Sequence, residues 1–439
     1  MALKRVIVAG AVLEVCYASI YLSHDPLTDI VLFIAAQAIA FALVAAGAYL
    51  LLNRPATVRP HPSVLTAIIL FGILFRLTLM LHPVVASDDI YRYIWDGRVA
   101  LDGINPFLHA PDSPSLAHLQ TDDLPIKINF PQMRTIYPPL AQWLFLLSNA
   151  VFGPSQSGMK FLLVLCDIVS IVLLVLLLRQ QGRSPELVVL YAWSPLPVLY
   201  FALDGHIDAL GIPFLLLFLY LAGRRKTVTA SIALGLSILA KLYPLFLWPF
   251  SWTTARPWSR RLVLMVIPPL MLAVGAWLYV EPTGGLLESF SVYSSTFEFN
   301  GSVFKLLLML LESNRNAHMV GGILFFCYLL MVFIISRPII EKSFLAFLGF
   351  IVFSASVQPW YLTWLAALVV LRWSPAVFVL LGTSNLSNLV VYQYRATGTW
   401  SDSVPLLLVE YLPFYGLLLW EWKRGGFGLS SPSTGAGGQ

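Results

Sequence analysis

The stretch Ile171–Leu178 reads IVLLVLLL and decides the class of fold. Its eight apolar residues do not alternate with polar ones, as the strands of a transmembrane β-barrel must. The run is the centre of a mostly apolar segment, 159–179, whose length of about 20 residues is that of a membrane-spanning helix. The stretch therefore predicts a helix that crosses a membrane.

The composition of the whole chain extends this conclusion. Of its 439 residues, 58% are apolar and only 11% are charged, whereas a soluble domain carries about 25% charged residues. A soluble globular fold, a disordered chain and a disulfide-rich secreted fold are excluded. Cys16, Cys166 and Cys327 lie in apolar runs, so no disulfide framework is indicated. We expect an all-α polytopic membrane protein, embedded in a lipid bilayer.

Basic residues predict the orientation of the chain in the membrane. Lys4 and Arg5 place the N-terminus inside, and Lys423 and Arg424 place the C-terminus inside. This placement also explains the net charge of +5 without a nucleic acid partner. We expect about 12–14 membrane segments, with the first run retained instead of removed as a signal peptide. The long runs are 6–22, 28–52, 63–81, 159–179, 185–203, 207–222, 262–281, 317–336, 341–357, 375–394 and 403–422.

One long polar stretch, 83–158, interrupts these runs. It holds seven Asp and four Lys or Arg, and its negative charge favours the outer side. The segment Ser87–Leu101 (SDDIYRYIWDGRVAL) predicts an amphipathic helix with Ser87 as its N-cap. The segment Pro138–Phe152 is apolar but short for a span, so it predicts a helix that lies in the membrane interface or dips into the membrane and returns.

Residues 227–255 allow two interpretations. A single span would place Arg256, Arg260 and Arg261 outside, whereas a break at Lys241 and Pro244 would return these arginines to the inside. We favour the broken version, which puts Lys241 at an outer tip.

Under this topology the polar residues within and between the spans gather at the outer surface. Each has a simpler explanation as well: a helix cap for an aspartate, a loop tip for a histidine, a snorkelling lysine, or an interfacial aromatic belt. The histidine lacks a second His or Cys at ligand spacing, so no metal site is predicted. No nucleotide-binding fingerprint is present, so an enzyme here would take lipid substrates. The gathered residues are Asp88, Asp89, Tyr137, Asp204, His206, Asp208, Lys241, Gln358, Trp360 and Tyr361.

The order of these short motifs resembles the GT-C superfamily of integral membrane glycosyltransferases, in particular glycosyltransferase family 87. The resemblance covers most of residues 60–375. The two spans before the acidic loop depart from the simplest pattern of that family, in which the loop follows the first span. The motifs are DDIYRY with WDG (88–97), GINPF (103–107), YPPL (137–140), GHID (205–208), AKLYP (240–244), FN (299–300) and PWY (359–361).

The resemblance implies a polyprenyl-phosphate sugar as donor and an aspartate at the start of the outer loop as general base. Asp88 matches that position best, with Asp89 as the alternative, and such enzymes generally work without a metal; no cofactor is expected. A cation should stabilise the departing lipid phosphate. Lys241 is the first candidate for this role, with His206 and Arg92 behind it. The substrate-binding candidates are Tyr91, Tyr137, Asp208, Asn300, Gln358, Trp360 and Tyr361.

The predicted function is therefore the transfer of a hexose to a lipid, glycan or protein acceptor at the extracytoplasmic face, with inversion. Mannose follows from the resemblance, and arabinose, glucose or galactose would leave the same motifs. The alternative is a polytopic transporter or lipid flippase, against which no internal repeat is visible. The expected organisation is a two-span segment (1–62), a catalytic core (63–375) with outer loops 83–158 and 282–316, C-terminal spans (376–424) and a disordered tail (425–439).

Overall fold

The structure is a computed structural model that describes residues 3–23, 25, 28–53, 60–279, 292, 295, 297–401 and 403–425. Over these residues the chain is helical, and the β contacts found are isolated bridges of Phe299 and Asn300 with Ser356. Among the described helices, eight are long and apolar enough to cross a membrane, or nine if one bent pair counts as a span. The all-α polytopic class is confirmed, and the chain is a multi-pass membrane protein.

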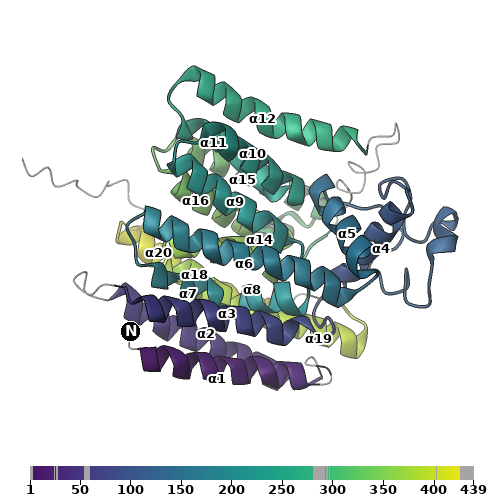
Figure 1. Cartoon of the computed structure of the whole chain (residues 1–439), viewed down its shortest axis with the longest axis horizontal. Coiled ribbons are helices and arrows are strands. Elements are labelled where there is room, and N and C mark those ends of the chain that lie inside the picture. Colours follow the sequence, from purple (N-terminus) through teal and green to yellow (C-terminus); the bar gives the residue numbers. More distant parts are fainter. Residues whose placement is uncertain are drawn as a thin grey trace, which may run out of the picture.

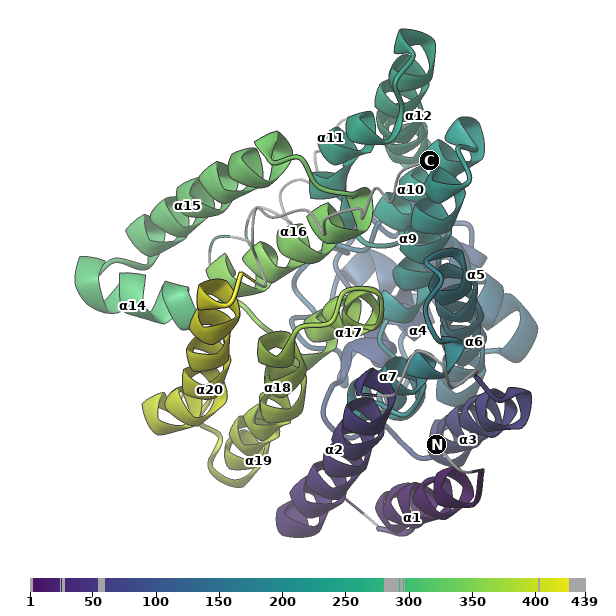
Figure 2. The ribbon, with the colours of Figure 1, turned by 90° about the vertical axis from the view of Figure 1, so that its left-hand side faces the viewer.

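The N-terminal region forms three long helices, α1 (Leu3–Leu22), α2 (Ile30–Leu52) and α3 (Pro62–Met80). Their bounds agree with the apolar runs 6–22, 28–52 and 63–81. In α1 the buried positions recur every three or four residues, so one stripe of the helix faces its neighbours. These helices pack side by side, α1 against both α2 and α3, and they lie at one edge of the bundle (Figures 1 and 2).

The polar stretch contains the helices α4 (Asp89–Leu101) and α5 (Pro139–Phe152), with a short 3₁₀ helix, η1 (Pro114–Leu119), between them. Both longer helices agree with the sequence prediction. The predicted N-cap is wrong by one residue: the helix begins at Asp89 with Asp88 at the N-cap position, and the hydroxyl of Ser87, one residue earlier, accepts a hydrogen bond from the Asp89 backbone at 3.3 Å. Close packing of α4 on α5 requires a glycine at 97, because a Cβ there would overlap the Asn149 side chain. The two helices gather beyond one end of the long bundle (Figure 1).

The next long helix, α6 (Gln156–Gln180), contains the apolar stretch Ile171–Leu178. The span predicted over 185–203 is wrong as a single helix. It is divided into η2 (Pro185–Val188), α7 (Val189–Ala192), α8 (Pro195–Pro197) and η3 (Val198–Leu203), and the two halves are bent by 52°. Pro195 and Pro197 explain the break, since proline cannot donate the backbone hydrogen bond of a continuing helix.

A hairpin of α9 (Asp208–Gly223) and α10 (Thr227–Ala240) follows. The helix α10 ends at Lys241, whose backbone is extended, and the chain continues through η4 (Tyr243–Leu247), α11 (Trp248–Ser251) and η5 (Trp252–Thr254). The predicted break at Lys241 and Pro244 is confirmed.

Helices of both halves of the chain, including α6, α7 and α9, pack against α17 (Leu362–Leu371). All residues of α17 are buried, and it lies near the middle of the bundle (Figure 2). The helix α14 (Ser302–Leu311) lies in the segment 282–316, predicted as the second outer loop, and was not itself predicted. The rest of that loop up to residue 296 lies mostly outside the described residues, and so does the tail after Gly425. The remaining elements are α12 (Trp258–Trp277), α14 (Ser302–Leu311), α15 (Asn314–Ile334), α16 (Ile339–Phe353), η6 (Pro359–Tyr361), α18 (Pro375–Thr383), η7 (Ser384–Ser387), α19 (Asn388–Thr397) and α20 (Val404–Lys423).

The number of membrane segments depends on the short helices. The predicted 12–14 segments are reached only if short apolar helices such as α9, α10 and α17 also serve as membrane segments beside the long ones. A helix of 10–17 residues is too short to cross about 30 Å of hydrocarbon unaided. These short helices pack inside the bundle, so their polar ends can lie within the protein near the membrane surface.

Candidate functional site

Asp89 is the first residue of α4, and its carboxylate meets two distant parts of the chain. Its Oδ2 lies 3.5 Å from Nδ1 of His206, and the Tyr137 side chain hydrogen-bonds to the same carboxylate. The Asp89 side chain is 31% exposed, so it remains open to a substrate. Residues from the outer loop and from the turn before α9 therefore share one site.

His206 lies in the turn between η3 and α9. Gly205 precedes it with φ +72°, a conformation that favours glycine. The His206 ring is fully buried and stacks on Trp360, with ring centroids 3.8 Å apart and planes 16° apart. Within the described residues neither ring nitrogen has a hydrogen-bond partner. Burial, with the charge of Lys241, holds the His206 pKa well below its usual value, so the ring is neutral and can donate one hydrogen bond.

Lys241 supplies a positive charge to the same site. Its Nζ lies 3.2 Å from the Asp208 carboxylate and over the rings of Tyr243 and Tyr361, at 5.1 and 5.6 Å from their centroids. The Trp364 indole donates to the other Asp208 oxygen at 2.7 Å. Because Lys241 ends α10 and Asp208 begins α9, the hairpin brings the two charges together.

The Asp89 carboxyl is tuned by this environment. Burial raises its pKa from 3.8 to about 6, Lys241 opposes that rise, and the charges of Asp88 and Asp208 add to it. A carboxylate whose pKa approaches neutrality is a better proton acceptor at physiological pH than an ordinary aspartate.

Asp88 has different neighbours. Burial raises the Asp88 pKa above its usual value, although the Arg395 guanidinium and a hydrogen bond with Asn129 oppose the rise. Asp88 thus turns toward α19 and the outer loop, while Asp89 turns toward His206 and Lys241. The resemblance ranked Asp88 first as the base, whereas this geometry favours Asp89.

Several other predicted residues lie outside the group around Asp89. Arg92 Nε donates to Asp96 at 2.8 Å, and its Nη1 donates to the Met133 carbonyl. The Tyr91 hydroxyl accepts a hydrogen bond from Gln156. The Asn300 amide donates to both oxygens of the buried Glu410, at 3.0 Å each. For these three residues the contacts indicate structural roles.

The predicted residues nearest to the Asn300 segment are those of the PWY motif. Val357 donates its backbone N–H to the Phe299 carbonyl at 2.7 Å, immediately before Gln358. The Gln358 side chain is half-buried, and Trp360 and Tyr361 reach His206 and Lys241 as described. Pairing between 299–300 and 355–357 thus holds the loop that carries Trp360.

Sequence reasoning missed three residues of the site. Trp364 binds Asp208, Tyr243 lies under Lys241, and Tyr93 stacks on Phe145 and contacts Tyr137 edge to face. Tyr243 stands inside a quoted motif and could have been proposed. Trp364 lies one helical turn after Trp360, but a tryptophan in an apolar segment is also an ordinary core residue.

Within the described ranges no group of three or more His, Cys, Asp or Glu could hold a metal ion. A cavity of about 560 Å³ lies between α9 and α10, at the end of the hairpin away from Lys241. A second, of about 410 Å³, lies in the outer loop around His109 and Arg134. Neither is lined by the residues that surround Asp89.

Comparison with known protein families agrees with the motifs. A family model described as alpha-(1->6)-mannopyranosyltransferase, N-terminal domain (the MptA/B family) matches residues 5–256, more than half of the chain. The matched region includes Asp89, Tyr137, His206, Asp208 and Lys241. No curated protein matches the chain. The family match favours mannosyl transfer over the transporter alternative. The chain therefore belongs to the alpha-(1->6)-mannopyranosyltransferase family and is an integral membrane mannosyltransferase.

Proposed function

We propose that this enzyme transfers mannose from a polyprenyl-phosphate donor to a hydroxyl of a glycan, glycolipid or protein acceptor at the extracytoplasmic face, with Asp89 as general base. The observation that carries the proposal is the meeting of Asp89 with His206 and Lys241, from three separate parts of the chain. In this proposal Asp89 is the proton acceptor, His206 is the hydrogen-bond donor and Lys241 is the cation of one partly exposed site.

The transfer is a single displacement. The acceptor oxygen attacks the anomeric carbon of mannose while Asp89 takes the hydroxyl proton, and the bond between that carbon and the phosphate oxygen breaks. Polyprenyl phosphate leaves with the electron pair. One carboxylate suffices, because no covalent glycosyl-enzyme forms, and the configuration at the anomeric carbon is inverted.

The linkage named for the family sets the stereochemistry of the reactants. An α-(1→6) product means that the attacking group is a primary hydroxyl at carbon 6. If the displacement inverts, an α product requires a donor whose mannose is β-linked to phosphate. The acceptor that suits this chain is therefore a mannoside with a free 6-hydroxyl.

The departing phosphate gains negative charge as the bond breaks, and fixed positive groups stabilise that charge. Lys241 is 14% exposed and has one carboxylate partner, so its remaining N–H bonds can point at the phosphate. The neutral His206 ring is fully buried, so the hydrogen bond that it can donate is available to the Asp89 carboxylate, which lies 3.5 Å from its Nδ1. The faces of Trp360 and Tyr361 offer flat apolar surfaces for the sugar ring or the first prenyl units.

The position of basic residues supports an active site on the outer side. Arg224, Arg225 and Lys226 lie at the end of the α9–α10 hairpin opposite to Asp208 and Lys241. Basic residues mark the cytoplasmic side. The group around Asp89 then faces the outside, and both termini lie in the cytoplasm.

The proposal is tested with Asp89→Asn and Asp88→Asn. Purified protein in nanodiscs is given a β-mannosyl polyprenyl phosphate and an alkyl α-mannoside, and transfer is measured by mass spectrometry. Loss of the general base should lower kcat by about 10²–10⁴-fold in Asp89→Asn. Asp88→Asn should show a much smaller loss, because it removes only a neighbouring charge.

Asp122→Asn is the matched control, since this aspartate is exposed in the same outer loop. Each variant is compared with wild type by thermal unfolding to exclude misfolding. Full activity of a folded Asp89→Asn variant, or a dead Asp88→Asn variant beside an active Asp89→Asn variant, would reject Asp89 as the base.

A further inference from the structure

The segment from Leu81 to Asp88 joins α3 to α4 without forming a helix. Its backbone is held by side chains from distant elements. Asp204 accepts hydrogen bonds from the N–H groups of Val85 and Ala86 at 2.8 and 3.1 Å. Lys160 of α6 donates to the His82 carbonyl at 2.6 Å. Because Asp89 follows this segment directly, its position depends on these contacts.

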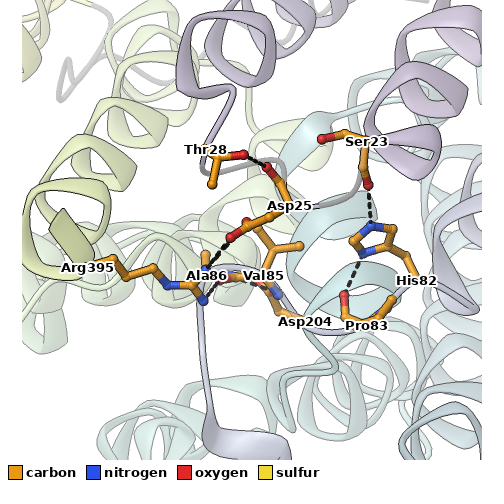
Figure 3. A network of polar contacts seen from close by, with 9 residues as sticks. All are labelled: Ser23, Asp25, Thr28, His82, Pro83, Val85, Ala86, Asp204 and Arg395. Carbon is orange, nitrogen blue, oxygen red and sulfur yellow. Dashed lines mark hydrogen bonds and ion pairs between the residues drawn. The ribbon is translucent and has the colours of Figure 1, made fainter.

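Arg395 holds the same segment from the other side. It lies in the last turn of α19, and its Nη2 donates to the Val85 carbonyl at 2.5 Å. Its Nη1 lies 3.4 Å from the Asp25 carboxylate, in the connection between α1 and α2. Figure 3 shows the Arg395 guanidinium between Asp25 and Val85, with Asp204 on the far side of the segment.

The N-terminal helices make a second contact with this segment. One ring nitrogen of His82 lies 3.1 Å from the Ser23 carbonyl at the end of α1, and the other lies 2.7 Å from the Pro83 carbonyl (Figure 3). The role of the two N-terminal spans had no explanation in the sequence. Their outer ends lie against the residues that lead into Asp89.

We propose that Arg395 is a positioning residue for Asp89, with Asp25 as the partner that orients its guanidinium. The proposal rests on the proposed function of Asp89. Arg395 fixes the carbonyl of Val85 while Asp204 fixes the N–H of the same residue, so the chain entering α4 is held on two sides. A displacement of about 1 Å at a catalytic group can lower the rate about 10²-fold.

An electrostatic role must be separated from this positioning role. Arg395 also lies close enough to Asp88 to favour its charged form. If Asp88 were the base, removal of Arg395 would move the acid limb of the pH profile upward. If Arg395 only positions Asp89, kcat falls while the acid limb stays in place.

The test uses Arg395→Ala, Arg395→Lys and Asp25→Asn in the transfer assay with the same donor and alkyl α-mannoside. Arg395→Ala should lower kcat about 10- to 100-fold with little change in KM for the donor. Arg395→Lys should return to within about fivefold of wild type, because an ammonium can still donate to the Val85 carbonyl. The kcat of Asp25→Asn should lie between those of Arg395→Ala and Arg395→Lys.

Arg315→Ala is the control, since Arg315 is an exposed arginine in the first turn of α15. Wild-type kcat in both Arg395→Ala and Asp25→Asn, beside an inactive Asp89→Asn, would overturn the positioning role and leave the proposed function intact. An upward shift of the acid limb in Arg395→Ala would also overturn it. If Arg395→Ala fails to fold, Arg395→Lys and Asp25→Asn decide, since loss of rate in Asp25→Asn with rescue by lysine supports positioning.

Discussion

The ion pair of Arg76 with Asp167 lies deep in the bundle, whereas that of Lys241 with Asp208 lies at the site. Both side chains of the first pair are 0% exposed. Both members of this pair have further hydrogen-bond partners. Arg76 also donates to the carbonyls of Gly72 and Ala192, and the Tyr191 hydroxyl donates to Asp167. In the second pair Asp208 is buried but Lys241 is 14% exposed.

The difference shows what each pair can do. Arg76 joins α3 to α6 and to the carbonyl end of α7, so it holds the broken span in place. Because both side chains are fully buried, a ligand cannot reach this pair from solvent. Lys241 lies over two aromatic rings and keeps one side open, so a phosphate can approach it. The two pairs thus differ in whether the cation is fully enclosed, as Arg76 is, or partly exposed, as Lys241 is.

The largest effect is expected from breaking the deep pair. Arg76→Met should lower the free energy of unfolding by about 3–5 kcal/mol, because it leaves the Asp167 carboxylate buried without its cation. The folded fraction should keep the wild-type kcat. Unfolding in mixed micelles, followed by circular dichroism, measures the stability, and the transfer assay measures the rate.

The double variant Arg76→Met with Asp167→Asn is the matched control for that experiment. It removes both charges and leaves an acceptor for the Tyr191 hydroxyl, so most of the lost stability should return. A double variant as unstable as Arg76→Met alone would show that Arg76 stabilises the bundle by packing and not by its charge. A stable but inactive Arg76→Met variant would contradict the contrast between the two pairs.

Lys241→Met breaks the ion pair of Lys241 with Asp208 and should lower kcat, which Arg76→Met should leave unchanged in the folded protein. Loss of a group that stabilises the charge of the leaving phosphate should lower kcat by about 10²–10³-fold. Stability should fall as well, because the buried Asp208 carboxylate loses its cation and keeps only the Trp364 hydrogen bond, so the contrast lies in the kcat of the folded fraction. Lys226→Met is the matched control: Lys226 is exposed and flanks the other end of α10, so its replacement should leave kcat unchanged. Equal losses in both variants would remove the case for Lys241.

Much of this contrast could be predicted from the sequence, and part of it could not. Apolar runs predicted the long helices, and the break at Lys241 followed from a lysine and a proline within one run. Pro195 and Pro197 also lie within one apolar run, 185–203, and predict a break there by the same reasoning. The Arg76–Asp167 pair went unnoticed because 91 residues separate its members, and each looks like an isolated charge in a span.

The site shows the same limit at the level of single residues. Motif order selected Asp89, Tyr137, His206, Asp208, Lys241, Trp360 and Tyr361, which do come together. It ranked Asp88 above Asp89, the reverse of the order that the geometry favours, because adjacent residues share nearly every sequence signal and differ in the direction of their side chains. It also included Arg92 and Asn300, whose polarity is explained by the partners Asp96 and Glu410.

The smallest effect is expected in the pH profile of the reaction, because the charges of Lys241 and Asp208 shift the pKa of Asp89. The Asp89 pKa is raised to about 6, and only the ionised carboxylate can accept a proton. In wild type kcat/KM should therefore fall about tenfold per pH unit below pH 6 and level off above it. Because Lys241 lowers the Asp89 pKa, its removal in Lys241→Met should move the acid limb upward, whereas Asp88→Asn should move it downward. The phosphodiester of the donor does not titrate in this range, so the limb belongs to the enzyme. If the acid limb stays in place in both variants, the general base does not feel the charge of Lys241. Asp89 and Lys241 would then be neighbours that do not act together in the reaction.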